Sequence, residues 1–332
     1  MITVRSCLNK KPFRCILNIQ SINTGYEKMS FLAFILIVFS AVLHASWNLV
    51  AKRSKMTVSF YTLICSVACL CWCHVQFWTP VNVLALPGKF YIFLVGSVLS
   101  DIIYCSGLVR AYRTMEMSTA YPMMRSLPIL LTAAVTTIGG FGNRLSALAM
   151  LGMVVVFTGC MMIPLTDFRS FKFKDYFNNK WFYIFLVACG TTGYTIFDKQ
   201  AQEVLNHCQQ YSALSKPMLS LTFYSTRVIL LCCSLMLVVL LLPGELNNFK
   251  EIIRNKKRFV LMAGFFASMT YTTVLIAMNY VDNVSYVQVF RQLGLIFGMA
   301  GGIFILKERF TFPKLIGVIL ILSGLALTVL KY

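Results

Sequence analysis

Apolar runs of about 20 residues recur along most of this 332-residue chain, and they decide what it can fold into. A run of that length lets an α-helix cross the roughly 30 Å hydrocarbon core of a bilayer. Strands of a membrane barrel would instead show shorter segments of strictly alternating hydrophobicity. Because the chain is also 58% hydrophobic and only 12% charged, the sequence predicts an all-α integral membrane protein.

Ten such runs are expected to form transmembrane helices. The sixth, over residues 181–197, is expected to be the shortest and the most polar. The predicted helices start near Phe31, Thr57, Phe90, Ser118, Leu145, Trp181, Met218, Phe259, Val284 and Phe312.

The net charge of +19 sets the expected orientation of the helices. Basic residues lie between apolar runs and form no basic stretch interleaved with aromatic residues, so no nucleic-acid partner is expected. Lys and Arg are more frequent in the loops after the odd-numbered helices than in those on the opposite side. By the positive-inside rule those loops are cytoplasmic, which places both termini outside.

Residues 1–29 form a basic, acid-poor tail that differs from the remainder. Its basic residues are Arg5, Lys10, Lys11, Arg14 and Lys28. The tail is interpreted either as an organellar targeting segment or as an extended start with Met29 as the true first residue. It is expected to be a disordered or non-native segment.

An internal repeat connects Arg125 to Arg291, each inside an otherwise apolar run. Residues 117–125 align with residues 283–291, and the match continues into later glycines. Upstream, residues 47–48 and Lys52 correspond to residues 194–195 and Lys199. The glycine correspondences are Gly152 with Gly317 and Gly159 with Gly324.

Five helices in each half force the second half to enter the bilayer from the opposite face. The sequence therefore predicts two inverted repeats, residues 30–165 and 181–331, joined by a linker over residues 166–180. Secondary transporters share this plan and bind substrate near mid-membrane between the repeats. Arg125 and Arg291 should then flank the midplane about 10 Å apart, with room for a small anion between them.

At these residues the chain resembles the EamA-type transporters of the drug/metabolite transporter superfamily. The resemblance rests on residues 44–48 (HASWN), 111–125 (AYRTMEMSTAYPMMR) and 306–310 (LKERF). It implies ten helices in two EamA-type repeats, and movement of small metabolites without ATP hydrolysis. The first half departs from the family pattern, since Gly142, Asn143 and Arg144 stand where such repeats carry a Glu-Arg pair like Glu308 and Arg309.

Charged residues inside apolar runs are the first candidates for a site, because a charge in hydrocarbon is costly. Arg125, Arg291 and Arg227 are predicted substrate contacts. The alternative is that they are tied to backbone carbonyls or to a buried acid. Asp101 is a candidate for proton coupling, and an ion pair with one of the arginines is equally natural.

Polar residues on one face of a membrane helix normally look inward, toward a neighbouring helix or a cavity. His44 and Asn48 share a face of the first helix, with Trp47 between them. These three residues are predicted to contact substrate, and interhelical hydrogen bonding is the alternative. Tyr121 lies one turn from Arg125 and is predicted to line the same cavity.

The sequence predicts a secondary active transporter of a small anionic or zwitterionic metabolite: an organic acid, an amino acid or a phospho/phosphonate compound. A membrane-embedded enzyme or a channel is the alternative. With three histidines in all, and no catalytic constellation, we expect no enzyme activity, metal or cofactor. The expected partners are the substrate and the lipid bilayer, with the chain a monomer or homodimer in the cell (inner) membrane.

Overall fold

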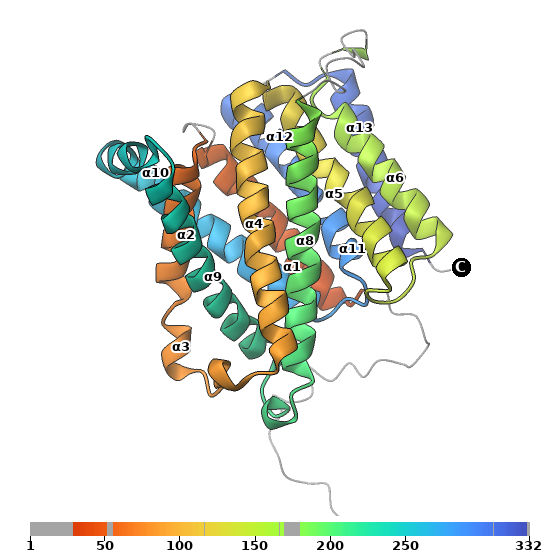
Figure 1. Ribbon diagram of the computed structural model, residues 1–332. Coiled ribbons are helices and arrows are strands. Elements are labelled where there is room, and N and C mark those ends of the chain that lie inside the picture. The colour runs from red at the N-terminus through yellow and green to blue at the C-terminus, as the bar shows by residue number, and fades with distance from the viewer. Residues whose placement is uncertain are drawn as a thin grey trace, which may run out of the picture.

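The computed structural model describes residues 29–51, 56–115, 117–165, 167–168, 180–307 and 309–330, which are mainly helical (Figure 1). The tail over residues 1–28, most of the predicted linker, Lys52 and Glu308 lie outside these ranges. The first half contains α1 (Phe31–Ala51), α2 (Val58–Trp72), α3 (Val75–Trp78), α4 (Gly88–Thr114), α5 (Met117–Gly139) and α6 (Ala147–Met162). The second contains α8 (Trp181–Asn206), α9 (Lys216–Leu241), α10 (Glu245–Met278), α11 (Val284–Phe290), α12 (Leu293–Leu306) and α13 (Phe312–Val329).

Six helical segments of the described chain are long and apolar enough to cross a membrane. Two further apolar helices, Phe31–Trp47 and Ala147–Met162, are shorter. The protein is thus an all-helical membrane protein, as the apolar runs predict. The six segments are Val58–Trp78, Gly88–Thr114, Lys216–Leu241, Glu245–Met278, Val284–Ile305 and Phe312–Val329.

Hydroxyl side chains determine where three of the helices begin. Thr57 Oγ1 accepts a hydrogen bond from Phe60 N at 3.1 Å, and Ser146 Oγ accepts one from Ala149 N at 3.2 Å. Ser215 Oγ accepts in the same way from the third residue after it, at 3.4 Å. Each cap satisfies one of the backbone N–H groups that a helix start leaves unpaired. All three starts lie within two residues of the predicted positions.

The sixth predicted helix is not the shortest, so that expectation is wrong. α8 extends over 26 residues, whereas α6 has 16. Its polar residues Asp198 and Gln202 are 0% and 2% exposed, so they face protein and not lipid. The second part of α8 has low hydropathy because its polar side chains are buried against protein. The apolar run in the sequence therefore ends before the helix does.

The ninth predicted helix is interrupted in the middle. α11 ends at Phe290 and α12 begins at Leu293, with Arg291 and Gln292 in a turn between them. Across this turn Gln292 N bonds to Val289 O at 3.1 Å, a three-residue and not a four-residue spacing. Broken helices are tolerated at membrane depth where protein or a cavity surrounds the exposed backbone.

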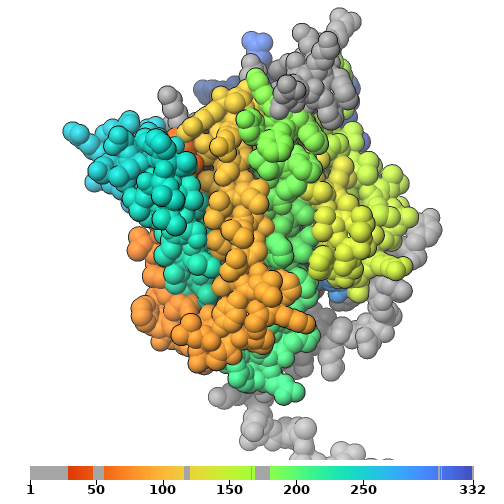
Figure 2. Space-filling view, in the orientation of Figure 1, coloured from red at the N-terminus to blue at the C-terminus, as the bar shows by residue number. Residues whose placement is uncertain are grey.

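α10 begins well before its predicted start near Phe259. Lys256 has non-helical dihedral angles (φ −132°, ψ 17°), so the helix is kinked, and the predicted start falls after the kink. The first part of α10 stands out at one edge of the bundle (Figure 2). The carboxylate of Glu245 anchors it, accepting from Ser59 N at 2.9 Å and pairing with Arg113 at 3.1 Å.

Long helices from the two halves pack side by side. α4 lies along α8, and α6 lies along α13 (Figure 1). Glycines let the second pair approach at the backbone: a Cβ added to Gly152 would lie 2.6 Å from Gly324 O, and one added to Gly159 would lie 2.8 Å from Gly317 O. α1 packs against α10 and α12.

Replacing Gly159 with alanine is expected to lower the thermal unfolding midpoint of the purified protein by several degrees. The new methyl group would lie 2.8 Å from Gly317 O and 2.9 Å from both Ile321 N and Ile321 Cγ1. Such overpacking costs about 1–3 kcal/mol. Gly298→Ala is the matched control, because a Cβ there meets nothing within 4 Å. Equal midpoints for the two variants would show that the α6–α13 contact is looser than described.

Candidate functional site

A cavity of about 110 Å³ lies inside the bundle, with walls from α1, α2, α4, α8, α9 and α10. It also reaches Arg291 at the break between α11 and α12. Both halves of the chain contribute, so the cavity lies between them. Its aromatic lining residues are Trp47, Tyr61, Tyr104, Tyr194, Tyr224 and Tyr271, and its charged ones are Asp101, Arg227 and Arg291, with His44 nearby in the wall.

Arg227 is paired with two buried carboxylates. Its Nη2 lies 2.8 Å from Asp101 Oδ2, and its Nε lies 3.1 Å from Asp198 Oδ1. The guanidinium carbon also lies 5.0 Å from the ring centre of Tyr271 and 5.8 Å from that of Tyr194, which is cation–π geometry. These contacts connect α4, α8 and α9 at the wall of the cavity.

Hydroxyl groups complete the hydrogen bonding of both carboxylates. Tyr61 donates to Asp101 Oδ1 at 2.6 Å, and Tyr271 donates to Asp198 Oδ2. Ser97 Oγ accepts from Arg227 Nε at 2.7 Å and donates to Asp198 Oδ1. Buried charges are tolerated when they are both paired and hydrogen-bonded, and this cluster meets both conditions.

Asp198 is a buried acid that the sequence analysis did not single out. It lies in the polar second part of α8, directly after the apolar run over residues 181–197. Its place next to Lys199, in a segment that repeats the end of the first helix, was the available signal. The pairing of Asp101 with an arginine is the alternative that the sequence left open.

Arg291 presents a buried cation to the cavity. Its side chain lines the wall, and the residue is 7% exposed. Among the described residues, its guanidinium has no hydrogen-bond or ion-pair partner; its backbone carbonyl accepts from Arg125 Nη2 at 2.9 Å. The two arginines of the repeat are therefore in contact, through the side chain of Arg125 and the backbone carbonyl of Arg291.

The remaining predicted site residues divide between the wall and its surroundings. His44 and Trp47 line the cavity, and Trp47 Nε1 donates to His44 Nδ1 at 3.0 Å. Arg125 and Tyr121 are not among the lining residues. The side chain of Asn48 lies outside the described part of the structure. Substrate contact by each of these residues stays a prediction.

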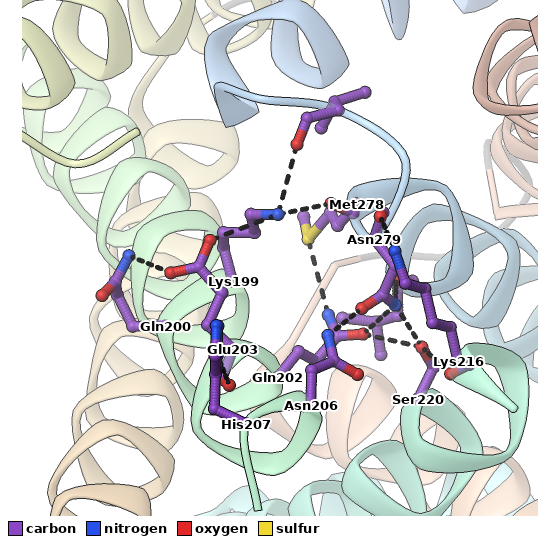
Figure 3. A network of polar contacts seen from close by, with 12 residues as sticks. Lys199, Gln200, Gln202, Glu203, Asn206, His207, Lys216, Ser220, Met278 and Asn279 are labelled. Atoms are coloured by element: carbon purple, nitrogen blue, oxygen red, sulfur yellow. Dashed lines mark hydrogen bonds and ion pairs between the residues drawn. The ribbon is translucent and has the colours of Figure 1, made fainter. Parts of the chain in front are cut away.

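A polar network fixes the connection that leads from α10 to α11 (Figure 3). Lys199 Nζ donates to Met278 O at 2.8 Å and to Val281 O at 3.2 Å. Lys216 Nζ donates to Asn279 O at 3.3 Å. The side chain of Asn279 in turn donates to Gln202 and Ser220 at 2.8 and 2.6 Å. Residues of α8 and α9 thereby fix the start of α11, the short helix that directly precedes Arg291.

Comparison with protein families indicates the class of the protein. Residues 179–330 match the EamA-like transporter family. The match covers a little less than half of the chain. The EamA-like family is part of the drug/metabolite transporter superfamily, whose members are membrane transporters, and the match together with the apolar helices fits a multi-pass transport protein. The EamA-like segment contains α8–α13 and therefore supplies Asp198, Arg227 and Arg291.

Solved structures support the fold across nearly the whole chain. One crystal structure aligns with a TM-score of 0.61 and 15% sequence identity, covering 89% of this chain and 95% of its own. At that identity the likeness shows the fold alone. None of the curated proteins compared with the sequence matches it. In the described residues, no three His, Cys, Asp or Glu side chains gather closely enough to hold a metal ion.

Replacing Arg227 with methionine is expected to destabilise the protein by about 3–5 kcal/mol, because two buried carboxylates lose their counterion. The triple variant Arg227→Met, Asp101→Asn, Asp198→Asn removes all three charges and should recover most of this loss. The measurement is the thermal unfolding midpoint in detergent. A single variant as stable as the wild type would contradict the pairing.

Proposed function

We propose that the protein is a secondary active transporter of a small anionic or zwitterionic metabolite. The observation that carries the proposal is the buried guanidinium of Arg291, which faces the cavity with no acid partner in the described structure. A cation withdrawn from water normally has a counterion. A substrate carboxylate or phosphate that enters the cavity would supply it, bound through two parallel hydrogen bonds.

The charge distribution around the cavity supports a substrate contact at Arg291 in preference to Arg227. Arg227 already forms ion pairs with Asp101 and Asp198. His44 and Trp47 lie in the wall with Arg291, and Tyr104 and Tyr224 add polar hydroxyls to it. Organic acids, amino acids and phospho/phosphonate compounds all fit this chemistry. Proton coupling through Asp101 stays a prediction.

We further propose the ten-helix layout of two inverted five-helix repeats, residues 30–165 and 181–331. In this layout α2 with α3, and α11 with α12, each count as one span. The helix pairs that pack together support it, because exchanging the repeats turns the α1–α10 pair into α8–α4 and leaves the α6–α13 and α2–α9 pairs unchanged. Alternating access between the repeats would expose the central cavity to each side of the membrane in turn.

The cell (inner) membrane is the proposed location, with the basic loops in the cytoplasm and both termini outside. We propose that the chain acts as a monomer or homodimer. The kinked start of α10 fits this orientation, since basic residues before a membrane span favour the cytoplasmic surface. Those residues are Lys250, Arg254, Lys256, Lys257 and Arg258.

Arg291→Ala is expected to reduce transport at least about tenfold, the effect of losing one charged hydrogen-bonded contact to the substrate. The measurement is counterflow in proteoliposomes with labelled succinate, glutamate and glycerol 3-phosphate as probes. Arg254→Ala is the control, because Arg254 is exposed on the first part of α10. Failure of the wild-type protein to move any such compound under any gradient would overturn the proposal.

A further inference from the structure

Arg125 contacts the backbone of its repeat partner instead of the cavity. Its Nη2 donates to the carbonyl of Arg291 at 2.9 Å, although the two residues belong to different halves of the chain. Arg291 lines the cavity and Arg125 does not. One arginine thus presents its side chain to the site, and the other holds the backbone of the first.

The carbonyl of Arg291 lies where the helical hydrogen bonding changes. In a continuous helix it would accept from Leu295 N, but that group bonds instead to Gln292 O at 2.9 Å. The Arg291 carbonyl accepts from Gly294 N at 3.1 Å, and Arg125 supplies a second donor. The side chain of Gln292 similarly donates to Gln288 O at 3.0 Å. Side chains therefore satisfy the carbonyls that the break exposes, as hydrocarbon surroundings require.

Gly294 makes room for this junction. A Cβ there would lie 3.3 Å from Ala41 O, 3.6 Å from Arg125 Nη2 and 3.7 Å from His44 Cδ2. The start of α12, the end of Arg125 and the cavity wall on α1 thus meet at one point. A shift of the break would move Arg291 relative to His44.

We infer that Arg125 is a positioning residue for Arg291: it fixes the α11–α12 break so that the Arg291 guanidinium faces the cavity. The inference rests on the proposed function for its link to the substrate, since Arg125 acts on the anion through Arg291. The bond requires one donor at the end of a long side chain. Lysine provides such a donor, whereas methionine has similar length and provides none.

Hydrogen–deuterium exchange of the purified protein tests the inference without any substrate. Arg125→Met is expected to speed amide exchange over residues 288–296 at least about tenfold, as expected for loss of about one hydrogen bond. Arg125→Lys should stay close to the wild type. Arg291→Ala is the matched control and should also stay close, because the variant keeps the carbonyl that Arg125 binds.

Gly294→Ala gives a second, independent variant. It keeps Arg125 but places a methyl group against the Ala41 carbonyl, so faster exchange over residues 288–296 is expected. Unchanged exchange in both Arg125→Met and Gly294→Ala would overturn the inference. So would an Arg125→Lys variant whose exchange is as fast as that of Arg125→Met.

Counterflow with succinate, glutamate and glycerol 3-phosphate then separates positioning from direct contact. Arg125→Lys is expected to restore the substrate KM that Arg125→Met raises, whereas Arg291→Lys should restore nothing, because a two-hydrogen-bond contact needs the guanidinium. Equal failure of the two lysine variants would indicate direct contact by both arginines. If the wild type moves none of these probes, the proposed function fails while the exchange data still decide the role of Arg125.

Discussion

The ion pairs of Arg227 with Asp101 and Asp198 are the interaction on which the interior of this protein depends. They bring charges from α4, α8 and α9 to one place, where the surrounding lipid offers no alternative partner. Tyrosine and serine hydroxyls from α2, α4 and α10 complete the coordination of the carboxylates. The carboxylates in the wall of the cavity are therefore already paired and hydrogen-bonded, and the cation left for a ligand is that of Arg291.

Satisfying backbone groups in hydrocarbon explains the second part of the site. The break between α11 and α12 interrupts the regular helical hydrogen bonding, and the long side chains of Arg125 and Gln292 donate to the carbonyls of Arg291 and Gln288 there. Lys199 and Lys216 do the same for the end of α10 and its connection to α11. Cations near helix C-termini also oppose the negative end of the helix dipole. Four long polar side chains thus stabilise the non-helical backbone that places Arg291.

Much of the fold could be predicted because apolar runs, hydroxyl caps and glycines act locally. Thr57 and Ser146 mark helix starts within two residues, and the repeat aligns Arg125 with the residue whose carbonyl it binds. The burial of Asp198 could not be predicted in the same way. Whether a polar residue at the end of a run faces protein or solvent depends on a distant partner, here Arg227. The break at Arg291 could not be predicted either, because no proline or glycine pair marks it in the sequence. Tertiary contacts stabilise it instead.

The glycine contacts between α6 and α13 have a mechanical consequence. Gly152 meets Gly324 and Gly159 meets Gly317, so two contacts seven residues apart on each helix must coincide. Sliding one helix past the other by one turn would place side chains against both glycine contacts at once. The two helices therefore pack closely in one register only. Neither helix lines the cavity. The pair therefore forms a fixed frame, and any change in the shape of the cavity has to come from the helices that surround it.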